Sequence, residues 1–387
     1  MILKIFIYIA TIIAVITLAT IAYSHFLLSK GTNQLMPHAS NTKTLSTETQ
    51  AITQTVFYEN THHNLDGSFS NTDKTLAKSA SIYSVLFRFV TQSKKHSTPT
   101  HPIPIHSLST NQLNQLQTDT VIRLGHSSIF IQLNGQKWLI DPVFSDRASP
   151  LSFIGPKRFH QPPITLDLLP PLDGILISHN HYDHLDKASI KALIHKTPLF
   201  VVPIGVNQTL SQWQVPRQKI VTLDWWQSVK LNGLEITATP AQHFSGRGLF
   251  DKNKSLWASY VISSPKTRLF FSGDSGYFDG FKRIGDHYGP FDMTLIEVGA
   301  YDQQWPNNHM TPEQSLQAHI DLKGAALLPI HNGTFNLAFH PWYEPFERIT
   351  TLAEKADIPI LTPIMGQVLT VNDLPQTHPW WRDVQSP

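Results

Sequence analysis

A dense set of potential metal ligands occupies one short stretch of the sequence. His179, His181, Asp183 and His184 fall within six positions, directly after the apolar run 174–177, which predicts a buried strand. A strand that ends in such a turn holds several donors at one point, as a borderline-soft divalent metal such as zinc requires. A polar loop that happens to be rich in histidine is the alternative. The chain has no cysteine, so thiolate ligands and disulfides are excluded.

Three further predicted strands also end at potential ligands, namely His243 after 234–239, Asp274 after 268–271 and His331 after 325–330. Each residue alone could equally cap a turn or lie on the surface. Their shared position at the ends of strands instead predicts that they converge on one site. Together with the first stretch they supply five histidines and two aspartates. One tetrahedral zinc cannot use so many, so the set predicts two metals with a shared ligand.

The elements that must position these residues begin near residue 119. Short β-rich runs at 121–124, 129–133 and 137–141 surround the hairpin signal Asn134-Gly135. After the metal strand we expect an amphipathic helix at about 187–196 and a strand at 199–202. This order predicts an α/β domain over 119–387.

His126 lies between the first two of these strands. Either it supports the metal ligands or it is a hydrogen-bonded structural histidine in a tight turn, and the sequence leaves both alternatives open.

Composition limits the class of protein. The chain has 387 residues, 41% hydrophobic content and a formal net charge of +2. This length is enough for a large core. Since the charges are balanced and no block of like charges occurs, a nucleic-acid partner is not expected.

The first thirty residues predict a transmembrane anchor. No Asp, Glu, Lys or Arg occurs from Ile5 to Leu28, and a helix of this length crosses a hydrocarbon core of about 30 Å. A cleaved signal or a buried helix are the alternatives. Lys4 and Lys30 flank the run, so charge bias only weakly favours a membrane-anchored protein with its catalytic domain on the non-cytoplasmic side, the periplasm in a bacterium.

Residues 31–55 are rich in Thr, Ser, Asn and Gln and predict a flexible linker. Residues 56–118 predict a lead-in region that wraps the domain. This region contains the pair His62-His63. With no carboxylate at ligand spacing nearby, we interpret the pair as polar residues on the surface.

The ligand pattern as a whole resembles the metallo-β-lactamase superfamily, which implies an αβ/βα four-layer sandwich. Further motifs resemble the branch that contains N-acylphosphatidylethanolamine-hydrolysing phospholipase D, and they lie at 124–126, 141–145, 240–243, 273–277 and 330–335. The likeness covers roughly residues 60 to 370, and this larger motif set is much more specific than the superfamily pattern alone.

The resemblance implies a division of the ligands between two zinc ions. One metal takes His179, His181 and His243, the other takes Asp183, His184 and His331, and Asp274 bridges them. It further implies that Tyr182 and His309 contact a phospholipid head group. The alternatives are a packed aromatic for Tyr182 and a surface loop residue for His309. Asn332, Phe244 and Asn308 depart from the family pattern, which puts the substrate in doubt more than the metals.

The expected activity is that of a binuclear zinc phosphodiesterase that cleaves N-acylphosphatidylethanolamine to N-acylethanolamine and phosphatidic acid. A metal-bridging hydroxide is the expected nucleophile. Asp183 or Asp274 orients it, and His309 is a candidate acid. A lactonase or another hydrolase of a small soluble substrate is the alternative, as is a non-catalytic metal-binding member of the fold.

Overall fold

The computed structural model describes residues 52–54, 62–73, 80–92 and 95–385. These residues belong to one compact unit, Gln50–Pro387. The predicted anchor 1–30 and nearly all of the predicted linker 31–55 lie outside the described residues.

The predicted membrane-anchored localisation is corrected. Among the residues that the structure describes, no helix combines the length and the apolar character needed to cross a membrane. We therefore withdraw the predictions of a membrane anchor and of a catalytic domain on the non-cytoplasmic side.

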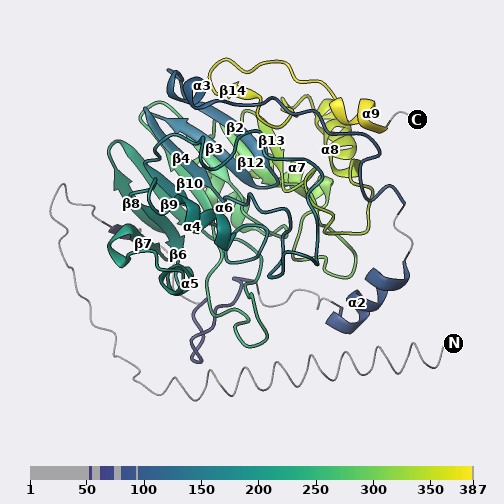
Figure 1. The fold of residues 1–387 in the computed structure, drawn as a ribbon, viewed down its shortest axis with the longest axis horizontal. Helices are drawn as coiled ribbons and strands as arrows, with labels where there is room; N and C mark the ends of the chain where they lie inside the picture. Colours follow the sequence, from purple (N-terminus) through teal and green to yellow (C-terminus); the bar gives the residue numbers. More distant parts are fainter. Residues whose placement is uncertain (1–51, 55–61, 74–79, 93–94, 386–387) are drawn as a thin grey trace. The chain divides into compact units, whose positions relative to one another are not determined.

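Two sheets of seven strands each form the centre of the domain (Figure 1). The first sheet has the order β1-β8-β9-β10-β11-β12-β13. Its strands are β1 (Ile52–Gln54), β8 (Gln227–Leu231), β9 (Leu234–Thr239), β10 (Ser259–Ser263), β11 (Arg268–Phe271), β12 (Met293–Glu297) and β13 (Leu327–Ile330). The pairs β11–β12 and β12–β13 are parallel and the others antiparallel, so the sheet is mixed.

The second sheet has the order β14-β2-β3-β4-β5-β6-β7. Its strands are β2 (Thr120–Gly125), β3 (Ser128–Leu133), β4 (Gln136–Ile140), β5 (Gly174–Leu176), β6 (Phe200–Pro203), β7 (Ile220–Leu223) and β14 (Val368–Thr370). Strands β4 to β7 run parallel, and β14, β2, β3 and β4 pair antiparallel.

Several strands are buried along their whole length because they are covered on both faces. β2, β3, β5 and β12 are buried at every position. One large apolar cluster joins the two sheets, with Ile129 and Ile131 of the second sheet packed together with Ile236 and Phe270 of the first. This cluster is the central layer of the core.

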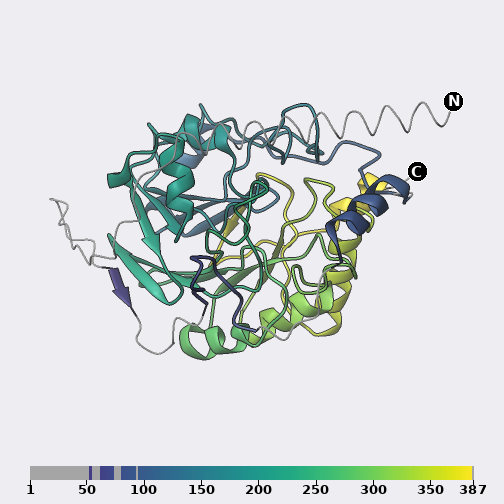
Figure 2. The same cartoon turned by 90° about the horizontal axis from the view of Figure 1, so that it is seen from below.

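Helices cover the outer face of each sheet. The helices α4 (Lys187–Leu193) and α5 (Val206–Gln212) share a second apolar cluster with the second sheet. Figure 2 shows these teal helices on the opposite side of the molecule from the green and yellow-green helices α6 (Gly280–Tyr288), α7 (Pro312–Asp321) and α8 (Glu344–Lys355). The arrangement is the αβ/βα sandwich that the family resemblance implied.

The chain preceding β2 lies against this sandwich. It contains α2 (Ile82–Thr91), capped by Ser81, and α3 (Thr110–Asn114), capped by Ser109. β1 pairs with β8, so the stretch predicted as a flexible linker ends in a short strand. We call residues 62–73 and 80–92 the strap. The last helix, α9 (Trp380–Gln385), buries both of its tryptophans.

Candidate metal centre

All seven predicted ligands come together at one end of the two sheets. His179, His181, Asp183 and His184 follow β5, His243 follows β9, Asp274 follows β11 and His331 follows β13. Their ligand atoms fall into two groups, each with every atom within 4.8 Å of the others. We call the two groups together the cage.

The first group is His179, His181, His243 and Asp274. His181 Nδ1 lies 2.9 Å from His179 Nε2 and 3.2 Å from His243 Nε2. The other ring nitrogen of His243 donates to the carbonyl of Asn308 at 2.9 Å. The Nε2 atom of His243 therefore carries a lone pair that points into the group.

These three imidazoles are neutral. Burial lowers the pKa of His181 to about 4. Burial, together with the charge of neighbouring histidines, holds the pKa of His179 and of His243 well below the usual range. A single proton on His181 Nδ1 can satisfy only one of the two facing nitrogens, whereas a cation would satisfy all three. The donor set therefore fits a metal.

Asp274 lies between the two groups. Its Oδ2 atom is 3.7 Å from the Nε2 atoms of both His179 and His243, and 3.1 Å from that of His331. Its Oδ1 atom is 3.0 Å from His184 Nε2. A carboxylate in this position can contact a metal in either group, as the sequence predicted for a bridging ligand.

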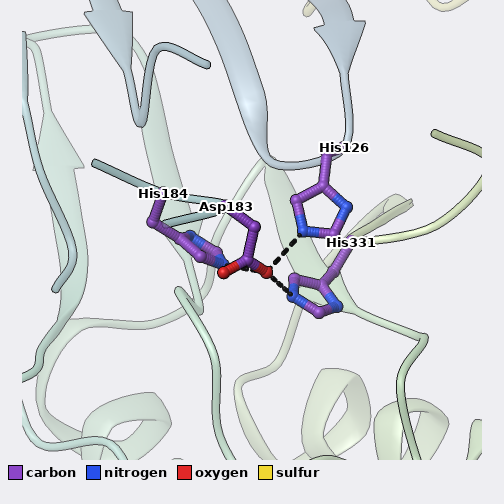
Figure 3. A group of neighbouring side chains, drawn as sticks. All are labelled: His126, Asp183, His184 and His331. Carbon is purple, nitrogen blue, oxygen red and sulfur yellow. Dashed lines mark hydrogen bonds and ion pairs between the residues drawn. The ribbon is translucent and has the colours of Figure 1, made fainter. Parts of the chain in front are cut away.

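The second group is Asp183, His184, His331 and, in addition, His126 (Figure 3). Asp183 Oδ2 lies 3.0 Å from His126 Nε2, 3.2 Å from His331 Nε2 and 3.5 Å from His184 Nε2. The sequence left the role of His126 open. In the structure its ring is buried, and the ring centroids of His126 and His331 are 4.0 Å apart.

Charge in the second group is balanced by protons in the metal-free state. Burial lowers the pKa of His184 and of His331, but the charges of Asp274 and Asp183 outweigh it. They raise the pKa of His331 to about 10 and that of His184 well above its usual value. Even so, His184 Nε2, His331 Nδ1 and Asp274 Oδ1 are buried without a hydrogen-bond partner. His184 Nε2 and Asp274 Oδ1 lie 3.0 Å apart. A cation that displaces the proton of His184 Nε2 would satisfy both atoms.

Asp141 fixes the orientation of His184. This residue follows β4 and is fully buried. One carboxylate oxygen accepts from His184 Nδ1 at 2.7 Å and from the hydroxyl of Ser178, and the other accepts from the Ser178 backbone N–H at 2.7 Å. A carboxylate behind a ligand imidazole selects the tautomer whose Nε2 faces the metal. No role was predicted for Asp141 from the sequence, although it occurs in one of the matched motifs.

Three residues at the site have left-handed backbone. The φ angles of His126, Asp141 and His331 are 53°, 42° and 63°. Each is the first or second residue after a strand, where the turn aims its side chain into the site. Such angles cost non-glycine residues about 1–2 kcal/mol, which the surrounding sheets offset.

His309 lies at the open edge of the cage. Its ring stacks on His331 with centroids 5.0 Å apart and meets His243 at 5.1 Å, and its side chain is 13% exposed. His309 Nδ1 is 3.5 Å from Glu297 Oε1. Glu297 is fully buried and also accepts from the Met310 backbone N–H at 2.7 Å. The structure therefore brings His309 to the site.

Tyr182 lies beside the cage and outside both ligand groups. Its hydroxyl donates to the carbonyl of Arg247 at 2.9 Å, and the Arg247 guanidinium lies 3.9 Å from the centre of its ring.

Phe244 packs against His181 with ring centroids 4.6 Å apart. The side chain of Asn332 instead accepts from Arg123 and donates to two backbone carbonyls.

The strap reaches the cage through Asn71. Its side chain accepts from the backbone N–H of His243 at 3.1 Å and donates to the carbonyl of the same residue at 2.9 Å. Trp257 Nε1 also donates to Asn71 at 3.0 Å. Asn71 therefore holds the backbone of a cage residue in the manner of a neighbouring strand. No pattern near Asn71 in the sequence indicated this contact.

The prediction of a surface pair is wrong for His62, which is buried, whereas His63 is exposed as predicted. Both imidazoles bind one carboxylate, that of Asp224. The carboxylate was missed because it lies 162 residues from His62 along the chain.

The two sheets and the cage define a class, the metal-dependent hydrolases of the metallo-β-lactamase fold. Residues 136–332 match the family described as "Beta-lactamase superfamily domain". An uncharacterised protein of Mycobacterium tuberculosis is 43% identical over 291 residues, covering 74% of this chain and 77% of that protein. The chain therefore belongs to the β-lactamase superfamily.

Relatives with named activities are similar over much of the chain. The N-acyl-phosphatidylethanolamine-hydrolyzing phospholipase D 1 of Caenorhabditis elegans is 33% identical, covering 70% of this chain and 81% of the worm protein. The mitochondrial enzyme of Saccharomyces cerevisiae with the same activity in its name is 38% identical, covering 60% of this chain and 51% of the yeast protein. The resemblance to this branch is thereby confirmed.

Solved structures share the fold. The isothiocyanate hydrolase from Delia radicum gut bacteria matches with a TM-score of 0.52 and 19% identity, covering 65% of this chain and 98% of that one. At this level of identity the likeness shows the fold alone.

Proposed function

We propose that this protein is a binuclear zinc phosphodiesterase of the phospholipase D type that converts N-acylphosphatidylethanolamine to N-acylethanolamine and phosphatidic acid. The observation that carries the proposal is Asp274, placed between two complete groups of ligands in a chain similar to a phospholipase D of this specificity over 81% of the latter's length. A binuclear site suits a phosphodiester because both the attacking and the leaving oxygen need positive charge.

In this proposal one zinc would be held by His179, His181 and His243 and the other by Asp183, His184 and His331, and Asp274, which faces both groups, would serve as the shared ligand. When bound, the two cations supply a water that is acidic enough to act as a nucleophile near neutral pH and positive charge beside the phosphate. The chain supplies the rest. Asp183 or Asp274 would accept one proton of the attacking water and fix its direction.

The reaction forms a bond from the water oxygen to phosphorus and breaks the bond from phosphorus to the ethanolamine oxygen. The leaving oxygen must take up a proton. His309 is the group for this step, since it lies at the open edge of the cage with one ring nitrogen near Glu297. The other ring nitrogen is then free to donate toward a substrate.

An apolar loop beside the site supports a lipid substrate. Leu249 and Phe250 are 75% and 82% exposed, and they follow Arg247, which contacts Tyr182. Adjacent exposed side chains of this size are unfavourable in water and suit a surface that enters a lipid interface.

A hydrolase of a small soluble substrate, such as a lactone, is the second candidate. The observation in its favour is a pocket that reaches His331 and is lined by both polar and apolar side chains, including Asn332, Phe335 and Trp342. Polar and apolar groups that converge beside potential metal ligands are typical of sites for small molecules.

The test is turnover of the zinc-loaded protein on N-acylphosphatidylethanolamine in mixed micelles, in water enriched in ¹⁸O. We expect N-acylethanolamine to be released and the label to appear in the phosphatidic acid, because the attack is on phosphorus. His181→Ala should abolish turnover and lower the zinc content, whereas the exposed control His195→Ala should leave both unchanged.

Activity on a lactone panel with none on the phospholipid would overturn the phospholipase assignment and leave the metal centre standing. Fewer than two zinc ions in the active wild-type protein would overturn the binuclear mechanism.

A further inference from the structure

The structure contains a third group of metal-ligand side chains, which shares no residue with the cage. It consists of His62, His63 and Asp224, whose ligand atoms lie within 4.8 Å of one another. The two histidines belong to the strap, and Asp224 directly follows β7 at the edge of the second sheet. The group therefore joins two parts of the chain that are remote in sequence.

The geometry of the group is specific. Asp224 presents one carboxylate oxygen to each imidazole, with Oδ1 at 2.7 Å from His62 Nε2 and Oδ2 at 2.7 Å from His63 Nε2. Oδ1 also accepts from the Trp225 backbone N–H at 2.8 Å. Two imidazole nitrogens and a carboxylate that face one point are the donors of many zinc sites with three protein ligands.

The surroundings hold the donors in place. The ring of His62 stacks on the buried ring of Trp225 with centroids 4.2 Å apart, and Phe69 of the strap lies against His63 at 5.0 Å. The side chains of His62 and Asp224 are 3% and 5% exposed. Donors whose rotamers are fixed by packing lose little entropy when a cation binds.

One side of the group is open. The side chain of His63 is 39% exposed, so solvent reaches the group there. An opening of this kind provides both an entry path for an ion and room for a water as the fourth ligand. A buried cluster closed on all sides would offer neither.

We propose that His62, His63 and Asp224 form a third metal site, which takes a divalent transition metal of the zinc or cobalt class. The 2.7 Å contacts are hydrogen bonds of the metal-free state. The metal takes the place of the Nε2 protons, and each imidazole stays neutral with its proton on Nδ1. Since zinc bonds to nitrogen and oxygen are about 2.0–2.1 Å, tetrahedral ligand atoms stand roughly 3.3 Å apart. Because the side chain of His63 is exposed, it can move far enough to lengthen its 2.7 Å contact with Asp224 to about 3.3 Å.

The site fastens the strap at one end. The backbone N–H of Ser70 donates to the carbonyl of His62, and the backbone N–H of Phe69 donates to the carbonyl of Asn253, both at 2.8 Å. Asn71 follows directly after Ser70 in the chain. Asn71 holds the backbone of His243. A cation at His62 and His63 thus secures the segment that supports the first group of the cage, without itself taking part in chemistry there.

The experiment is metal stoichiometry of the purified full chain. The protein is stripped with a chelator, reloaded with Co²⁺, desalted and analysed by mass spectrometry of the metal and by visible absorption. We expect about three cobalt per wild-type chain, and about two for His63→Ala and for Asp224→Asn. His195→Ala, another exposed histidine, is the matched control and should keep all three.

Limited proteolysis gives a second readout. Cleavage within the strap should slow when the third cobalt is added to wild type and should not respond in His63→Ala. If Asp224→Asn fails to fold, the exposed position of His63 keeps the test decisive. A wild-type count of two, or a third cobalt that persists in His63→Ala, would overturn the proposal. Loss of cobalt in His181→Ala alone reports on the cage and leaves this site unaffected.

Discussion

The cage and the strap that contacts it are held in place in different ways. Cage residues follow the ends of β5, β9, β11 and β13, strands fixed by backbone ladders. Residues 62–73 of the strap are joined to the domain largely by side chains, with His62 and His63 on Asp224 and Asn71 on His243. The strands therefore position the ligands of the metal centre, and the strap supports the backbone of one of them, His243.

The largest effect should come from Asp274→Asn, because this residue faces both ligand groups. We expect metal content to fall from about two ions in the cage to one or none. Hydrolysis should fall by at least about 10³-fold, since loss of one electrostatic contact to the transition state already costs about 10²–10³-fold. Metal analysis and steady-state kinetics measure the two effects. If the variant kept two cage metals, the bridging position of Asp274 would have no functional meaning.

Metal binding to the cage should depend steeply on pH. The pKa of His331 is raised to about 10 and that of His184 is raised well above its usual value, so both carry protons near pH 7.5 in the metal-free protein. A metal needs the neutral imidazole, so binding releases these protons and affinity rises with pH. With about two protons released, affinity should change by about 100-fold per pH unit. Calorimetry in buffers of different ionisation enthalpy counts them, and zero release would contradict the assignment of charge in the second group.

Asp141→Asn should have a smaller effect, because Asp141 acts through His184. The amide keeps the size, but its one oxygen cannot replace the two carboxylate oxygens that accept from His184 and from the backbone N–H of Ser178. Loss of such a partner typically weakens metal binding by about 10–100-fold. Competition with a chromophoric chelator measures the affinity. Unchanged affinity would mean that the sheet alone orients His184.

Asn71→Ala tests the strap and should have the smallest effect. It removes two hydrogen bonds to the backbone of His243, and a net contribution of about 1 kcal/mol corresponds to roughly fivefold weaker retention of a metal in the first group. The control is Asn64→Ala, which removes a bond to Ser68 within the strap. Chelator competition distinguishes the two, and equal retention in both variants would show that the strap covers the site without supporting it.

The cage could be predicted from the sequence because its signals are local. Each ligand lies in the loop that follows an apolar run, and the two packed sheets bring the ends of these strands together whatever the intervening loops do. The strands 234–239 and 268–271 were predicted with their observed bounds, and the helix after the metal motif ends three residues earlier than expected.

The contacts of the strap could not be predicted in this way. His62 and Asn71 depend on partners 162 and 172 residues away, and nothing in their neighbourhood marks them. Asp141 and His126 were visible as members of motifs, but their roles depend on side-chain hydrogen bonds to cage residues, which spacing does not encode. Pattern reasoning therefore locates ligands better than it locates the groups that support them.

The left-handed backbone at His126 and His331 also restricts how this centre can change in evolution. Asparagine, aspartate and glycine tolerate such angles, whereas β-branched residues do not. A descendant that gave up its metals would therefore replace these two histidines most readily with small polar residues or glycine. The turns would remain as a trace of the lost chemistry.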